Sequence, residues 1–167
     1  SDTLLIDNSG AATAQSGTLS DSRLTGFEMT GQILYDAFED VTLKLGSNQD
    51  NFTLNNTISG VTRIETNAGI DQVTVEQFSG DVHLHTGIDA DTITVFDGTD
   101  DYAAPESMLV IDGGNDGDSY FFNVSSGTAG GSFVNLSDSG ASGIDTLQYT
   151  GSTAGDLIQL DTIYDPE

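Results

Sequence analysis

The sequence predicts an all-β fold, a right-handed parallel β-solenoid with about 20 residues per coil. A seven-residue pattern that ends in Asp, a polar residue and an apolar residue recurs at 46–52, 67–73, 87–93, 114–120 and 141–147. Apolar and polar residues alternate after each Asp, which is typical of a half-buried strand. Glycine is frequent, with 20 residues, and proline is rare, with two, which favours tight turns between short strands.

Two short strands are expected in each coil. The strand after each Asp has its apolar residues at 52–54, 73–75, 93–95, 120–122, 147–149 and 158–160. A second strand precedes each Asp, with apolar residues at 41–45, 64, 82–84 and 109–111. A single coil cannot bury its apolar face alone, whereas stacked coils bury a continuous apolar column.

Two stretches interrupt the repeat. Residues 7–40 lack the Asp corner, and residues 97–107 form an inserted loop that lengthens one coil. Residues 2–6 resemble the end of a further copy whose first half is missing. We therefore expect residues 1–167 to form one solenoid domain that is a fragment of a longer repeat protein.

The composition excludes several classes of function. The chain has 27 acidic and three basic residues, a formal net charge of −24, and no Lys or Arg follows Arg63. Such a chain cannot neutralise nucleic-acid phosphates or bind anionic lipid electrostatically. No apolar run is long enough to insert into a membrane, and the absence of Cys excludes disulfides and thiolate metal sites. The acidity is compatible with bound cations and also with a saline habitat.

The corner pattern resembles the G-G-x-G-x-D-x-U-x repeat of calcium-binding RTX (haemolysin-type) proteins, most closely at 86–93 and 112–119. The D-T-L-x-I stretch at 2–6, Leu24-Thr25-Gly26 and the L-x-L-G stretch at 43–46 are similar to repeat units of very large bacterial surface and secreted proteins. This resemblance implies an extracellular or cell-surface bacterial location, an adhesin-type role and bound Ca²⁺. Because RTX repeats are nine residues long and these are near 20, the calcium ligands of that family are not transferred.

Stacked Asp corners require compensation of their charge, and two interpretations remain open. The carboxylates accept backbone N–H groups of their own turns, or they bind Ca²⁺. The structural interpretation is favoured for Asp50 and Asp71, which stand in single-Asp corners. Ca²⁺ is favoured around the inserted loop, where the candidate ligands are Asp89, Asp91, Asp97, Asp100, Asp101, Asp112, Asn115, Asp116 and Asp118.

The predicted function is a non-catalytic structural or adhesive repeat segment of a large extracellular bacterial protein, stiffened by Ca²⁺ at its Asp corners. Neighbouring repeats of the parent chain and a surface glycan or other cell-surface ligand are the expected partners. The alternative is a carbohydrate-binding module or a β-helix polysaccharide-active enzyme. The enzyme is disfavoured, because residues after Arg63 contain no base to hold an acidic sugar and the chain has no Trp to line a sugar subsite.

Overall fold

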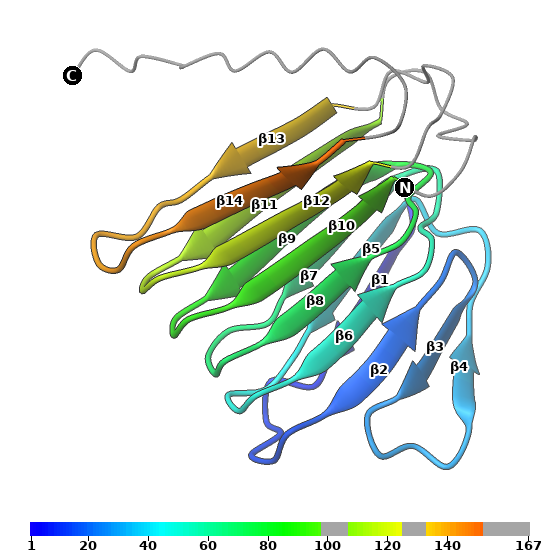
Figure 1. Cartoon of the computed structure of the whole chain (residues 1–167). Coiled ribbons are helices and arrows are strands. Elements are labelled where there is room, and N and C mark those ends of the chain that lie inside the picture. The colour runs from blue at the N-terminus through cyan, green and yellow to red at the C-terminus, as the bar shows by residue number, and fades with distance from the viewer. Residues whose placement is uncertain (98–106, 125–132, 152–167) are drawn as a thin grey trace.

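The computed structural model describes residues 1–97, 107–124 and 133–151, which form two β-sheets (Figure 1). The six-stranded sheet is parallel and has the order β1 (Thr3–Asp7), β5 (Asp40–Lys44), β7 (Val61–Glu65), β9 (Asp81–Gly87), β11 (Met108–Gly114) and β13 (Phe133–Ser137). The eight-stranded sheet has the order β14 (Thr146–Thr150), β12 (Ser119–Val124), β10 (Thr92–Asp97), β8 (Gln72–Val75), β6 (Asn51–Leu54), β2 (Ser16–Leu19), β3 (Arg23–Gly26) and β4 (Gln32–Leu34).

The predicted strands after and before the Asp corners are present, and their repeats lie side by side. From β5 to β14, successive strands alternate between the two sheets. In the six-stranded sheet, Ile64 pairs with Leu43 on one side and with Leu84 on the other. In the eight-stranded sheet, Val73 pairs with Phe52 and with Ile93. Equivalent residues of successive repeats are thus neighbours on parallel strands.

The prediction of a single right-handed parallel β-solenoid is wrong. The strands form two separate open sheets, of which one is parallel and one is mixed. The second sheet is mixed because β3 pairs antiparallel with β2 on one side and with β4 on the other. The difference originates in residues 16–34, where the Asp corner is missing and tight turns return the chain directly to the same sheet. Direct returns give antiparallel pairs, whereas parallel pairs require a longer crossover. The all-β class is correct, and the described residues contain no helix.

The apolar core lies between the inner faces of the two sheets. In β7 and β9 the residues alternate between buried and more exposed positions, as a strand with one buried face requires. The largest fully buried side chains come from both sheets and include Phe52, Leu43, Leu54, Ile64, Leu84, Ile93, Leu109 and Ile111. These residues are the apolar positions that flank the Asp corners in the sequence, so the corners enclose one end of this core.

Truncation of a core side chain is expected to cost much more stability than truncation of an exposed one. Leu84 of β9 is 2% exposed and Leu5 of β1 is 57% exposed. We expect Leu84→Ala to lower the free energy of unfolding by about 2–5 kcal/mol, and Leu5→Ala to change it by about 0.5 kcal/mol or less. Urea unfolding of both variants measures the difference. Equal losses would contradict this placement of the core.

Candidate metal centre

The corners bring the backbones of successive repeats unusually close. Gly87 and Gly114 have positive φ angles of 107° and 97°, and Asp89 and Asp116 follow with 77° and 79°. A Cβ on Gly87 would lie 1.9 Å from the carbonyl oxygen of Asn67 in the previous repeat. Glycine, Asn and Asp adopt such left-handed conformations most readily, which explains their recurrence in the seven-residue pattern.

The fixed aspartates of the corners connect one repeat to the next. Each carboxylate accepts the backbone N–H of its equivalent in the preceding repeat, and we call this series the aspartate ladder. The N–H of Asp50 donates to Oδ1 of Asp71 at 2.7 Å, and the N–H of Asp71 donates to Oδ1 of Asp91 at 2.8 Å. The N–H of Asp91 donates to Oδ1 of Asp118 at 2.8 Å, and the N–H of Asp118 to Oδ1 of Asp145 at 3.0 Å.

The aspartate ladder gives Asp50 and Asp71 the structural role favoured from the sequence, with one correction. The N–H groups that the carboxylates accept at Oδ1 belong to the preceding repeat. Asp50 also accepts, at Oδ2, the N–H of Gly46 in its own corner at 3.3 Å. At the start of the ladder, the N–H of Gln15 donates to Oδ1 of Asp50 at 2.7 Å. The carboxylates therefore fix the register between repeats and not only the shape of a turn.

The second carboxylate oxygen of the middle ladder residues has no donor. Oδ2 of Asp71 and Oδ2 of Asp91 are buried without a hydrogen-bond partner. Thr66 and Thr86 lie beside these carboxyls, but Thr66 donates its hydroxyl proton to the carbonyl of Thr86 and Thr86 donates to the carbonyl of Gly113. Each threonine lowers the pKa of the carboxyl beside it, but by less than burial raises it. The buried Oδ2 oxygens without a donor favour the protonated carboxyl.

Burial raises the pKa of Asp71 to about 6 and the pKa of Asp91 to about 7. The backbone N–H groups that they accept and the hydroxyls of Thr66 and Thr86 lower the pKa of the two carboxyls, but by less than burial raises it. Neighbouring carboxylates raise the pKa further, those of Asp50 and Asp89 for Asp71 and those of Asp71 and Asp118 for Asp91. The interior of the ladder thus holds protons close to neutral pH.

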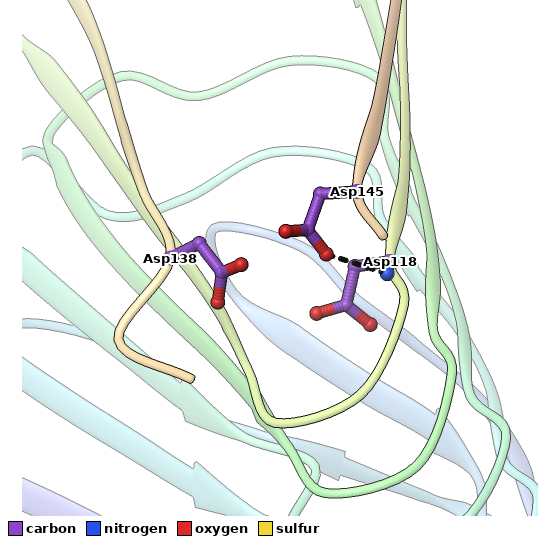
Figure 2. Close-up of side chains that lie close together, drawn as sticks. All are labelled: Asp118, Asp138 and Asp145. Carbon is purple, nitrogen blue, oxygen red and sulfur yellow. Dashed lines mark hydrogen bonds between the residues drawn. The ribbon is translucent and has the colours of Figure 1, made fainter. Parts of the chain in front are cut away.

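Three carboxylates converge at the last described repeats (Figure 2). Asp118 precedes β12, Asp138 follows β13 and Asp145 precedes β14, and one oxygen of each lies within 4.8 Å of the others. Asp118 is buried, and the other two are exposed. The hydrogen bond between Asp138 and Asp145 raises the pKa of Asp138 and lowers the pKa of Asp145.

The hydroxyl of Tyr120 adjoins this cluster where a glycine replaces threonine. Gly113 occupies the position held by Thr66 and Thr86 in the earlier repeats, as the pairing of β7, β9 and β11 shows. A Cβ on Gly113 would lie 2.0 Å from the hydroxyl oxygen of Tyr120 and 2.3 Å from Oδ2 of Asp118. Both oxygens are buried without a hydrogen-bond partner. These two unsatisfied buried oxygens therefore leave no room for a side chain at position 113 and lie beside the carboxylate cluster.

The predicted ligands Asp89 and Asp116 lie in the exposed part of the corner. The carboxylate of Asp89 accepts the N–H of Gly69 at 3.2 Å, and that of Asp116 accepts the N–H of Asp89 at 3.3 Å. They form a second, exposed series of inter-repeat hydrogen bonds next to the aspartate ladder. Asp91 and Asp118, by contrast, belong to the buried ladder.

The remaining predicted ligands are distributed over β11 and the loops. Asp112 accepts the N–H of Ser139 at 2.9 Å and lies 3.4 Å from Nδ1 of His85. Asn115 is exposed, and its N–H donates to the carbonyl of Gly87 at 2.8 Å. The backbone of Asp97 ends β10, and Asp100 and Asp101 lie outside the described residues. Within the described ranges, Asp118 is the one predicted ligand that the structure places in a cluster of three metal-ligating groups.

Asp138 and Asp145 are not among the metal ligands predicted from the sequence. Asp145 is the fixed Asp of the pattern at 141–147, so its place next to Asp118 was readable from the repeat. Asp138 follows a strand and has no place in the corner pattern. Alignment of the strand ends that carry Thr66, Thr86 and Gly113 would have placed Asp138 in the same column.

Comparisons with protein-family models, curated proteins and solved structures gave no match to this chain. The described residues contain no helix of a length and hydropathy that would cross a membrane.

The raised pKa of Asp91 predicts an unusual dependence of stability on pH. A carboxyl with a raised pKa contributes stability fully below its ordinary pKa of 3.8, and this contribution is lost as the pH rises through the folded value of about 7. We expect the wild type to lose up to about 1.4 kcal/mol of unfolding free energy per pH unit and per such carboxyl in this window.

The variant Asp91→Asn tests this dependence, because an amide accepts the N–H of Asp71 through its oxygen and donates to Thr86 through its nitrogen. Urea unfolding at pH 5, 6, 7 and 8 should show a smaller loss of stability with rising pH in the variant. Parallel pH profiles of the two proteins would contradict a protonated Asp91.

Proposed function

We propose that this chain is a non-catalytic structural segment of an extracellular bacterial protein, and that Ca²⁺ bound by Asp118, Asp138 and Asp145 locks its terminal repeats together. The observation that carries the proposal is the buried carboxyl of Asp118: its Oδ2 has no hydrogen-bond partner, and one of its oxygens lies within 4.8 Å of two exposed carboxylates. An unpaired buried carboxylate oxygen is costly. At Asp118, unlike Asp71 and Asp91, two further carboxylates are close enough to bind the same cation.

The chain supplies no basic side chain for this cluster from its acidic part. No Lys or Arg follows Arg63. Lys44 pairs with Glu65 at 2.7 Å, and Arg63 pairs with Asp40 at 2.7 Å. Neutralisation of Asp118, Asp138 and Asp145 is therefore left to protons or to ions from solution.

The chemistry of the cluster favours Ca²⁺ over Mg²⁺. Ca²⁺ accepts six to eight oxygen ligands in a flexible geometry, whereas Mg²⁺ demands a near-ideal octahedron and retains its water. The three carboxylates and the adjacent hydroxyl of Tyr120 are oxygen ligands only. They come from three separate segments, and water would complete the coordination, as is common at calcium sites.

The position of the cluster explains how a cation would act mechanically. Asp138 ends a strand of the six-stranded sheet, and Asp145 and Asp118 begin neighbouring strands of the eight-stranded sheet. A bound ion would join the two sheets and two successive repeats at one point. Because binding selects the folded state, it stabilises that state by mass action.

The extracellular setting and the absence of catalysis belong to the same proposal. The resemblance to RTX-type repeats and the affinity range of extracellular calcium sites support a location where Ca²⁺ is abundant. The ladder carboxylates accept backbone N–H groups and so link successive repeats. The carboxylates that an acid–base enzyme would require for catalysis thus have a structural role in this chain. Neighbouring repeats of a longer parent chain would continue the stack.

A calcium titration tests the proposed site. We expect thermal unfolding, followed by circular dichroism, to shift to higher temperature with Ca²⁺ but not with equal Mg²⁺ or matched ionic strength of NaCl. One site at 100 times its dissociation constant adds about 2.7 kcal/mol. Asp138→Asn and Asp145→Asn should abolish most of the shift, because each removes one carboxylate from the cluster.

Asp36→Asn is the matched control, since Asp36 is an exposed carboxylate between β4 and β5, at the end of the eight-stranded sheet opposite β14. It should retain the full Ca²⁺ shift. A Ca²⁺ response that Mg²⁺ or NaCl reproduces, or that all three variants retain equally, would mean charge screening and would overturn the proposed site.

A further inference from the structure

The outer face of the eight-stranded sheet carries no charged side chain over two complete columns of residues. Twelve outward positions on β2, β6, β8, β10, β12 and β14 form these columns in the parallel register of the sheet. We call this surface the neutral face, and its residues are Ser16, Asn51, Gln72, Thr92, Ser119, Thr146, Thr18, Thr53, Thr74, Thr94, Phe121 and Gln148.

The other sheet shows that this neutrality is a property of one face and not of the composition. The outward positions of the six-stranded sheet include Asp40, Lys44, Arg63, Glu65 and Asp112. In a chain with a formal charge of −24, charge is thus present on one outer face and absent from the central columns of the other. β-Sheet propensity favours Thr and disfavours Asp and Glu at exposed strand positions, but the strands of the six-stranded sheet carry Asp40, Glu65 and Asp112 all the same.

An open hollow with an aromatic wall adjoins the neutral face. It has a volume of about 450 Å³ and is lined by Asn55, Glu76, Gln77 and Phe96. Phe96 is 43% exposed. Phe121 lies on the neighbouring strand, diagonally across from Phe96, because Phe96 pairs with Asn123 and Thr94 pairs with Phe121. Aromatic side chains in such diagonal positions are within reach of one another.

The polar groups of the hollow are held in place. Nδ2 of Asn55 donates to Oε2 of Glu76 at 2.5 Å, which orients the carboxylate across two adjacent strands. The hollow therefore combines an exposed aromatic ring with an amide from Gln77 and one fixed carboxylate. A few polar groups that converge beside an apolar wall are the usual composition of a small-ligand site.

We propose that the hollow and the neutral face bind a neutral polysaccharide chain. The ring face of an aromatic side chain carries partial negative charge, and the C–H groups of a sugar ring carry partial positive charge, so the two stack. Sugar hydroxyls donate to the Glu76 carboxylate and exchange hydrogen bonds with the amides of Asn55 and Gln77. Further sugar units lie over the uncharged hydroxyl and amide groups of the neutral face.

The charge distribution selects a neutral partner over an acidic one. The field of a strongly acidic chain repels polyanions such as acidic polysaccharides. A basic polymer would be drawn to the Asp corners and the outer face of the six-stranded sheet, where the carboxylates are concentrated. The neutral face carries no charged side chain that would favour either kind of polymer. This inference is independent of the calcium site.

Native affinity electrophoresis through gels that contain polysaccharide tests the proposal, because the acidic chain migrates well. The panel comprises hydroxyethylcellulose, galactomannan and dextran, with carboxymethylcellulose as the charged counterpart of the first. We expect at least one neutral polymer to retard the protein and carboxymethylcellulose to retard it less. Phe96→Ala and Glu76→Gln should each weaken the affinity by about fivefold or more.

His83→Ala is the matched control, because His83 is an exposed ring on the outer face of the six-stranded sheet. It should leave the retardation unchanged. Thermal unfolding of each variant verifies that it is folded, and Phe121→Ala provides a second aromatic variant. The proposal is overturned if no neutral polymer retards the protein, if carboxymethylcellulose retards it equally, or if the folded Phe96, Phe121 and Glu76 variants all migrate like the wild type.

Discussion

The hydrogen bond from the backbone N–H of one corner aspartate to the carboxyl of the next is the interaction on which the rest of the structure depends. It recurs from Asp50 to Asp145 and spans each successive repeat. Each ladder aspartate before Asp145 donates its N–H to the next repeat and accepts an N–H from the preceding repeat at its carboxyl. A repeat can therefore join the series in only one register. That register places Phe52, Val73 and Ile93 side by side in the core. The positive-φ glycines and aspartates of the corner allow the close backbone approach that the bond requires.

The same interaction creates a charge problem. In the interior of the ladder, burial leaves Oδ2 of Asp71 and Oδ2 of Asp91 without a donor and raises the pKa of both carboxyls, so they keep protons close to neutral pH. At the last described repeats, Gly113 replaces the threonine of the earlier repeats and exposed carboxylates adjoin Asp118. In the proposed calcium site, one divalent cation would neutralise these carboxylates together, whereas one proton neutralises only one of them. Under that proposal, proton and cation are alternative answers to one constraint.

The sequence was informative where the structure follows local alternation and uninformative where it follows pairing. The strands and their parallel neighbours were predictable, because each Asp is followed by apolar residues at every second position. The antiparallel β2–β3–β4 was not, since short strands near 16–34 look alike whether the chain returns directly or crosses over. The place of Asp138 beside Asp145 depends on the register between β13 and β11, which no corner motif encodes. The structural role of Asp50 and Asp71 was predicted correctly, but the source of their N–H donors was not.

The distribution of charge follows from where the carboxylates are used. The ladder confines one series of acids to the interior of the corners, and the exposed series of Asp89 and Asp116 lies alongside it. The parallel register places equivalent outward positions of successive repeats side by side in a sheet. If each of these positions carried the same charge, they would form a column of like charges unless opposite charges intervened. On the six-stranded sheet opposite charges do intervene, as in the pair of Lys44 and Glu65. After Arg63 the chain has no Lys or Arg left for this purpose. Repulsion between like charges therefore favours uncharged columns there. A surface that is kept neutral for that reason is also one that a neutral polymer can approach.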